Sequence, residues 1–156
     1  MQTLSFYNAI ANDGVMVKPQ FVERIVSNNK EIARFPSEVI NPKILSDQNL
    51  GALRTILRNI VLRGTGKSLS SEYFSMAGKT GTARTEYWMA DWSENRRYIS
   101  SFAGYFPADQ PKYSCIVVIH KPSTKKGYYG ADVTGPVFKR IAQKIYTDSP
   151  LRDTIV

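Results

Sequence analysis

Apolar residues recur at helical spacing in two segments of the first half of the chain. The first segment covers residues 4–11, and the Asn12-Asp13-Gly14 sequence that follows is typical of a helix end. A longer amphipathic segment starts at Ser46, a residue type that caps helix N-termini, and stops at Gly64. Its apolar side chains form one face: Leu50, Leu53, Leu57, Ile60 and Val61. The pattern therefore predicts two helices, each with one buried side.

Shorter runs rich in β-branched and aromatic residues predict strands. Residues 15–17 and 21–26 form two such runs, which Pro19 separates. Asn28-Asn29 predicts a turn that leads into a second extended arm at residues 31–35.

The second half of the chain is predicted to form a sheet. Residues 98–106 and 113–120 are strand-like, and the turn residues 107–111 between them predict an antiparallel hairpin. Residues 77–83 supply a third strand. A last helix follows, with Pro136 in its first turn and apolar positions at Val133, Val137, Phe138, Ile141 and Ile145. Three strands flanked by helices predict an α+β fold, and 156 residues suit a single domain over residues 1–156.

Composition and charge narrow the classes of function. Apolar residues make up 42% of the chain, an ordinary globular value. The 21 Lys and Arg against 13 Asp and Glu give a net charge of +8, which suits an anionic membrane or cell-wall polymer as well as nucleic acid. The basic residues are scattered rather than gathered in a stripe, which disfavours nucleic acid. Pairs such as Arg96-Arg97 and Lys125-Lys126 are predicted to be solvated loop charges.

The single cysteine and the single histidine limit the chemistry further. Cys115 lies inside an apolar run, and His120 ends it, so an intrachain disulfide is impossible and a metal site with nitrogen and sulfur ligands is not expected. We expect no cofactor. The chain contains no run of about eighteen apolar residues and no signal peptide, so this chain alone is expected neither to span a membrane nor to direct its own export.

The segment Ala77–Ala83 carries the most informative chemistry. Side chains alternate along a strand, so Lys79 and Gly81 share one face while Thr80 and Thr82 share the other. Gly81 lets an extended ligand lie close to the backbone, and the ammonium and hydroxyl groups suit an anionic peptide or peptide mimic. An ordinary strand with an exposed lysine remains the alternative at this point.

Several segments, in order along nearly the whole chain, resemble one known family. Lys79-Thr80-Gly81 is the third motif of the penicillin-binding proteins. The chain resembles the C-terminal half of a class B penicillin-binding protein transpeptidase domain, in the wider superfamily that includes the serine β-lactamases. The further matching segments are residues 2–19, 101–107, 111–113, 127–130 and 136–138.

The resemblance implies a peptidoglycan D,D-transpeptidase that cross-links stem peptides through a serine ester and binds β-lactams. Lys79 would set the electrostatics of the cleft, and Thr80 and Thr82 would supply polar contacts, with the Thr82 hydroxyl as the better carboxylate partner. The backbone N–H of Thr82 would be one oxyanion-hole donor, and Gly81 would let the substrate or a β-lactam pack against the strand.

Aromatic residues near the implied cleft have two open interpretations. Tyr128 and Tyr129 resemble an aromatic substrate-binding loop beside the cleft, or they are exposed tyrosines over the last helix. Trp88 and Trp92 lie in a predicted long loop over residues 86–97, either as part of a mobile loop beside the cleft or as anchors of that loop.

The nucleophile expected of this family is missing from the chain. Ser27-Asn28-Asn29-Lys30 and residues 123–126 match the Ser-x-x-Lys motif in sequence. Neither is predicted to lie at a helix N-terminus, where one helical turn would bring the lysine next to the serine. Residues 27–29 and 93–95 likewise match Ser-x-Asn by letters only. We therefore expect a fragment that is inactive alone, with the nucleophile helix, the N-terminal strands and the membrane anchor upstream.

The resemblance also implies a location and partners. It implies the extracytoplasmic face of the bacterial inner membrane, in the periplasm, with cell-wall synthesis or division proteins as possible partners. Because the family's N-terminal strands would lie beside residues 113–120, that strand is predicted to have an unpaired edge that favours self-association.

Two other functions are less well supported. Residues 64–68 and 78–80 end like phosphate-binding loops, but the glycine that the motif requires is replaced by Val61 and Tyr73. A non-enzymatic basic binding module that happens to carry Lys-Thr-Gly remains the alternative.

Overall fold

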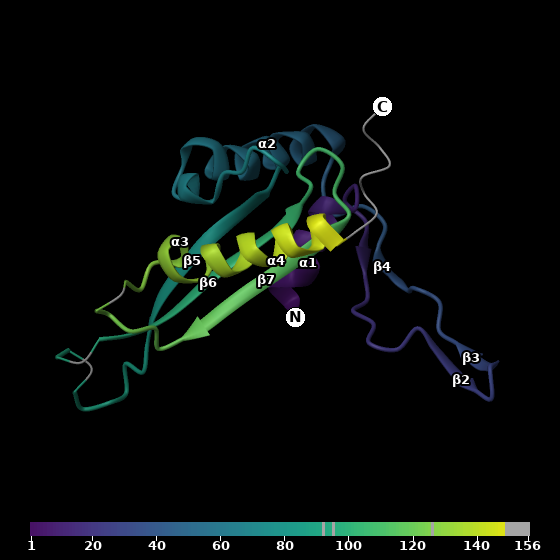
Figure 1. The fold of residues 1–156 in the computed structure, drawn as a ribbon, viewed down its shortest axis with the longest axis horizontal. Coiled ribbons are helices and arrows are strands. Elements are labelled where there is room, and N and C mark those ends of the chain that lie inside the picture. The colour runs from purple at the N-terminus through teal and green to yellow at the C-terminus, as the bar shows by residue number, and fades with distance from the viewer. Residues whose placement is uncertain (92, 95, 126, 149–156) are drawn as a thin grey trace.

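The computed structural model describes residues 1–91, 93–94, 96–125 and 127–148, and it has a three-stranded antiparallel sheet at its centre (Figure 1). The strands are β5 (Ala77–Thr85), β6 (Arg97–Phe106) and β7 (Tyr113–His120), in the order β5-β6-β7. The helices are α1 (Gln2–Ala11), α2 (Asp47–Arg63), α3 (Gly130–Val133) and α4 (Gly135–Asp148), with a 3₁₀ turn η1 at Lys67–Leu69. This confirms the predicted α+β fold with a sheet of three strands.

The sheet separates two apolar clusters, because alternate residues of β6 point to opposite faces. Phe102 and Phe106 pack with Phe138 of α4 on one face. Tyr105 and Ala77 pack with α1 and α2 on the other face. Figure 1 shows this layering, with α4 in front of the sheet and α1 behind it.

Polar contacts from α2 fix the helical layer to its neighbours. Arg54 donates from Nε to the carbonyl of Ile10 at 2.8 Å and from Nη2 to the carbonyl of Ala11 at 2.9 Å. These carbonyls belong to the last turn of α1, where no partner exists within the helix. Arg58 donates to the carbonyl of Met76, one residue before β5, at 3.0 Å. The helix α2 therefore positions both α1 and the start of β5.

The predicted helices and hairpins are confirmed at most of their boundaries. Ser46 caps α2 by accepting a hydrogen bond from the Asn49 N–H, and the cap at the other end is Gly64. The predicted pairing of residues 98–106 with 113–120 is the β6–β7 ladder.

The predicted last helix is wrong in one respect. Val133 belongs to the short helix α3, and Thr134 separates it from α4, where Pro136 lies in the first turn. The sequence pattern did not indicate β4 (Val39–Asn41) or η1, and it predicted an end for β5 two residues before the observed one.

A long hairpin projects from the body of the molecule (Figure 1). Its strands are β2 (Arg24–Ser27) and β3 (Lys30–Arg34), and its turn residues Asn28 and Asn29 have φ angles of 48° and 58°. Such positive φ values are typical of tight hairpin turns and are tolerated by asparagine. At its base, β1 (Met16–Val17) pairs with β4.

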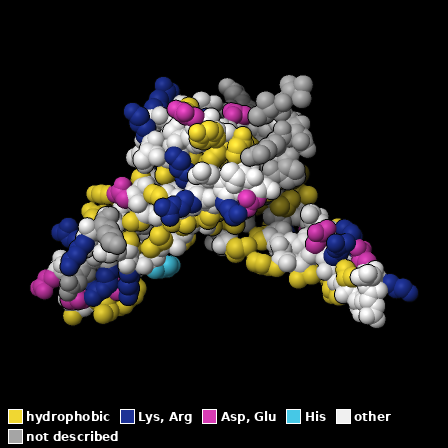
Figure 2. All heavy atoms as spheres, in the orientation of Figure 1, with side chains coloured by type: hydrophobic (Ala, Val, Ile, Leu, Met, Phe, Trp, Pro, Cys, Tyr) yellow, Lys and Arg dark blue, Asp and Glu magenta, His cyan; other side chains and the backbone are white. Residues whose placement is uncertain are grey.

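The hairpin exposes apolar side chains that a globular protein normally buries (Figure 2). Within the hairpin and the segments leading to it, the exposed apolar side chains are Phe21, Val22, Ile25, Val26, Ile32 and Phe35. None of the helices in the described ranges is both long and apolar enough to cross a membrane.

Candidate functional site

The Lys79-Thr80-Gly81-Thr82 segment lies in the middle of β5, at one edge of the central sheet. β5 pairs with β6 in a register that sets Gly81 opposite Ser101 and Thr82 opposite Ser100. Among the described residues, no strand pairs with the other edge of β5. The segment therefore presents a backbone edge to which an extended ligand can hydrogen-bond.

The direction of the backbone N–H and carbonyl groups along β5 follows from the pairing of β6 with β7. Lys121 donates its N–H to the carbonyl of Tyr98 at 2.8 Å, so even-numbered residues of β6 direct their backbone groups to the β7 side. Odd-numbered residues of β6, including Ser101, then face β5 and its partner Gly81. Thr80 and Thr82 therefore direct their N–H and carbonyl groups toward the open edge.

The Lys79 side chain follows this open edge. Its ammonium donates to the Thr80 carbonyl at 2.7 Å and to the Thr80 Oγ1 at 3.3 Å. The Thr80 Oγ1 also lies 3.1 Å from the Oγ1 of Thr65, which follows α2. An exposed cation and a half-buried hydroxyl thus lie beside the outward-facing backbone.

The Thr82 hydroxyl is in contact with α3. The N–H of Gly130 donates to the Thr82 Oγ1 at 3.1 Å, and Thr82 is exposed. Gly81 lies so close to β6 that an added Cβ would come within 2.4 Å of the Ser101 Oγ. A side chain at Gly81 would therefore require the Ser101 hydroxyl to rotate away, and its absence also leaves room for a ligand.

The two tyrosines of the predicted aromatic loop immediately precede Gly130. Tyr128 stacks on Tyr98 of β6 with ring centroids 4.0 Å apart and an angle of 11°. The Tyr128 hydroxyl donates to the Tyr129 hydroxyl at 3.3 Å, and this hydrogen bond is the largest cause of the raised pKa of Tyr128. Tyr129 is 57% exposed, so its ring is accessible next to the strand.

Two features that sequence reasoning missed hold the neighbouring loops in place. Glu86 forms ion pairs with Arg97 at 3.0 Å and Lys121 at 2.5 Å, and Arg97 also pairs with Asp91 at 2.8 Å. Arg97 is therefore an anchor of the loop that joins β5 to β6, and its prediction as a solvated loop charge is wrong. The second feature is a group of buried hydroxyls, at Ser100 and Thr134, that bind the backbone on either side of Tyr129.

Ser27, the serine of the first apparent Ser-x-x-Lys motif, lies in the β2–β3 hairpin rather than in the site that β5 forms. Ser27 and Lys30 face each other across the β2–β3 turn and are both exposed, and no helix joins them. Asn95 and Lys126, which complete the other apparent motifs, and Trp92 lie outside the described residues. Trp88 is described and is 78% exposed.

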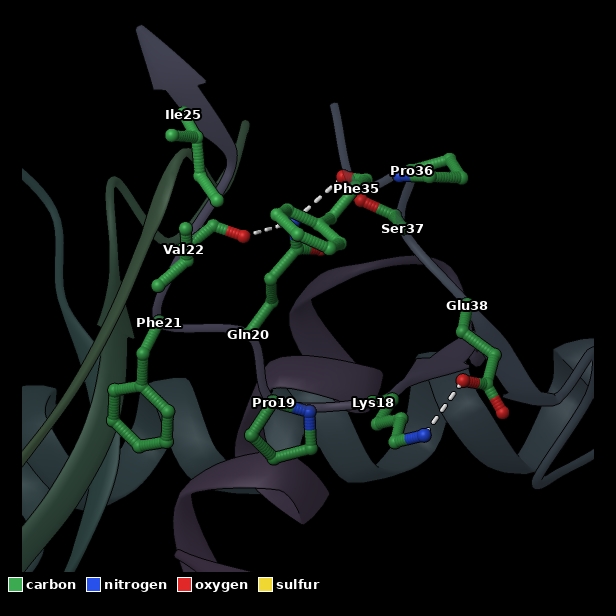
Figure 3. Close-up of a pocket in the computed structure, with 10 residues that line it drawn as sticks. All are labelled: Lys18, Pro19, Gln20, Phe21, Val22, Ile25, Phe35, Pro36, Ser37 and Glu38. Atoms are coloured by element: carbon green, nitrogen blue, oxygen red, sulfur yellow. Dashed lines mark hydrogen bonds and ion pairs between the residues drawn. The ribbon is translucent and has the colours of Figure 1, made fainter. Parts of the chain in front are cut away.

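A concave groove lies along the hairpin, and none of the residues that line it belongs to β5 (Figure 3). It has a volume of about 780 Å³. Gln20 lies at its centre and donates to the carbonyls of Val22 and Phe35, while Lys18 pairs with Glu38 at the rim. No cluster of His, Cys, Asp and Glu that could hold a metal ion is found in the part of the chain that the structure describes.

Residues 1–143 match the family model described as the penicillin binding protein transpeptidase domain. A Neisseria meningitidis protein named probable peptidoglycan D,D-transpeptidase PenA is 29% identical over 142 residues, which is 90% of this chain and 22% of the relative. Penicillin-binding protein PbpB of Mycolicibacterium smegmatis is 28% identical over 152 residues, which is 91% of this chain and 23% of the relative. The chain thus spans less than a quarter of the length of these relatives.

A solved structure has the same fold over most of the chain. Penicillin-binding protein 3 of Mycobacterium tuberculosis, complexed with aztreonam, superposes with a TM-score of 0.73 and 29% identity. The match covers 95% of this chain and 34% of that one.

Proposed function

Because this chain belongs to the penicillin-binding protein transpeptidase family, we propose that it supplies the substrate-binding strand of a peptidoglycan D,D-transpeptidase. The observation that carries the proposal is the open edge of β5, where the outward backbone of Thr80 and Thr82 stands beside the Lys79 ammonium. The relatives and the solved structure support the assignment, since their names include a D,D-transpeptidase and a complex with aztreonam.

In this proposal the substrate is a peptidoglycan stem peptide, and β-lactams bind in its place. The peptide lies along β5 as an added strand, and Gly81 keeps the surface free of a side chain at the crossing point. The Thr82 N–H donates to the oxyanion that forms on the attacked carbonyl, and the Lys79 charge and Thr82 hydroxyl attract the substrate carboxylate. Tyr128 and Tyr129 form an aromatic wall beside it. No cofactor is required.

The chain is proposed to be the C-terminal part of one transpeptidase domain, with residues 1–156 lacking the nucleophilic serine. That serine and its lysine base belong to a preceding part of the longer protein, which an N-terminal segment anchors at the outer face of the bacterial inner membrane. Cell-wall synthesis or division proteins are its proposed partners. Nucleic acid is not, because the positive charge is not gathered in one stripe along the sequence.

We also propose that the other edge of the sheet, β7, pairs with a second chain when this chain stands alone. Among the described residues, β7 pairs only with β6. Val118 pairs with Ser101, whose backbone groups face β5. The backbone N–H of Val118 therefore points away from β6, toward the open edge of β7. Unpaired strand edges of this kind promote association between chains.

The test is covalent labelling by penicillin, followed by intact mass, on this chain and on the longer protein that contains it. We expect an adduct only on the longer protein, at a serine outside this chain. Lys79→Ala in the longer protein should lower the acylation rate by roughly a hundredfold, because a charged partner of the substrate carboxylate is lost from the cleft.

Lys30→Ala is the matched control, since Lys30 is also exposed but lies at the hairpin turn. An adduct on this chain alone would show that Ser27 or Ser123 is a nucleophile after all. The absence of an adduct on either protein would refute the transpeptidase proposal and favour a binding module.

A further inference from the structure

Three hydroxyl groups hold the backbone that leads from the aromatic loop into α3. Ser100, fully buried in β6, donates to the carbonyl of Tyr128. Thr134, also fully buried, donates from Oγ1 to the carbonyl of Gly130 at 2.8 Å. Thr82 accepts the N–H of Gly130 at 3.1 Å. Buried hydroxyls are costly unless they are paired, so these groups hold the loop in one position.

The loop lies directly on the backbone of the two strands. A Cβ added to Gly130 would come within 2.5 Å of the Ser101 carbonyl oxygen and 2.9 Å of the Gly81 carbonyl oxygen. Both atoms belong to paired strands and cannot move aside easily. The Gly130 backbone therefore packs directly against both strands, and this contact restricts the movement of its N–H relative to Thr82.

The hydrogen bond from Gly130 determines what the Thr82 hydroxyl can do. A hydroxyl has one proton and two lone pairs, and the Gly130 N–H occupies a lone pair. The proton of Thr82 must then point away from Gly130, so this exposed hydroxyl acts as a donor to a further partner. Accepting one hydrogen bond also polarises the hydroxyl and strengthens the one that it donates.

We infer that Ser100, Gly130 and Thr134 are positioning residues that orient the Thr82 hydroxyl as a donor to the carboxylate of the ligand. The inference rests on the proposed function and adds a specific role for residues that touch no substrate. A carboxylate only accepts hydrogen bonds, so a hydroxyl whose proton already points outward suits it. Loss of the loop anchor frees that proton to rotate, and carboxylate recognition weakens while the rest of the cleft persists.

The test compares acylation of the full-length protein by benzylpenicillin and by its methyl ester, which lacks the carboxylate charge. Thr134→Val removes the hydroxyl at constant shape, and we expect it to slow acylation by benzylpenicillin about tenfold. The rate with the ester, measured at concentrations high enough to follow its slower reaction, should stay unchanged. Thr134→Ser keeps the hydroxyl and should restore the rate with benzylpenicillin.

Thr55→Val is the matched control, because Thr55 makes the same type of hydroxyl-to-carbonyl bond, to Gly51 on the exposed side of α2. If Thr134→Val does not fold, Ser100→Ala serves as the second variant, since it frees the Tyr128 carbonyl without changing Thr82. An equal loss with both probes, or no loss with either, would overturn the inference. A wild-type protein that neither probe acylates would instead refute the proposed function, and the inference would fall with it.

Discussion

The β5 edge and the β2–β3 hairpin are opposite kinds of surface on one molecule. At β5, backbone lies against backbone at Gly81 and Gly130, and the exposed groups are a cation, hydroxyls and outward-facing amides. At the hairpin, the exposed groups are large apolar side chains such as Phe21 around a groove of about 780 Å³. The hairpin has the groove, whereas the β5 edge carries polar groups of defined direction.

The difference shows that the presence of a cavity and the presence of polar groups with fixed directions are separate properties. The hairpin groove offers mainly apolar area, which attracts any apolar surface and selects weakly between ligands. The β5 edge holds polar groups whose directions are set by the ladder and by buried hydroxyls. Preorganised groups of this kind stabilise charge without having to reorganise. Substitutions should therefore have large effects near β5 and small effects on the hairpin.

Gly130→Ala should give the greatest loss of stability, because its Cβ would overlap backbone atoms of both strands. We expect the free energy of unfolding to fall by about 2–3 kcal/mol. Urea denaturation of this chain, monitored by circular dichroism, measures the change.

Gly51→Ala is the control for that substitution. No atom lies within 4 Å of a Cβ at Gly51 on α2, so alanine there should stabilise the protein by up to about 1 kcal/mol. Equal effects at the two glycines would mean that the loop over β5 is loosely packed, and the contrast between the two regions would disappear.

Tyr105→Phe should raise the free energy of unfolding by about 1 kcal/mol at neutral pH. The Tyr105 hydroxyl is buried under the sheet and finds no hydrogen-bond partner within the described residues, so its removal ends an uncompensated desolvation. Urea titrations of the variant and the wild type at pH 7 provide the comparison. Destabilisation instead would show that the hydroxyl is hydrogen-bonded in solution.

The same substitution has a pH signature. Burial raises the pKa of Tyr105; the charge of Arg54 lowers it by a smaller amount, and the charge of Asp109 raises it further. The cost of burying this tyrosine is therefore constant below the usual tyrosine pKa of about 10, and it grows as pH rises from that value toward the higher pKa of the folded state. The wild type should therefore lose more stability than Tyr105→Phe between about pH 9 and pH 11, roughly one unit on either side of that value.

Phe21→Ser should change the free energy of unfolding by less than about 0.5 kcal/mol, because Phe21 is 86% exposed. It should also leave self-association unchanged, whereas Val118→Pro should reduce it by removing an outward N–H of β7. Sedimentation velocity on the two variants distinguishes the edges. Loss of association in Phe21→Ser alone would show that the chains associate through the hairpin rather than through β7.

The sequence predicts those parts of the fold that local chemistry determines. Ser46 and Gly64 bracket α2 because capping involves only nearby backbone groups. Asn28-Asn29 marks a turn because asparagine tolerates positive φ. The Lys79–Thr82 segment could be recognised as a candidate site because its side chains alternate on a strand, which is also a local property.

The supporting residues could not be found in this way. Gly130 and Thr82 are 48 positions apart, so their hydrogen bond depends on how α3 meets the sheet. Ser100 looks like any polar residue in a strand until its burial is known. A serine within an aromatic-rich strand and a glycine directly after two tyrosines were the available signals, but neither indicates a role without the tertiary contact.

The outward direction of the β5 backbone has a consequence for mutational robustness. Every amino acid except proline carries the same N–H, so almost no substitution at position 82 can delete the amide that faces the open edge. Apart from a change to proline, a mutation can affect this N–H donor only by moving the backbone that carries it. Variants that discriminate against one ligand while retaining another should therefore accumulate in the loop anchors and the neighbouring strands. Substitutions there can shift the backbone at position 82 slightly and so change ligand selectivity.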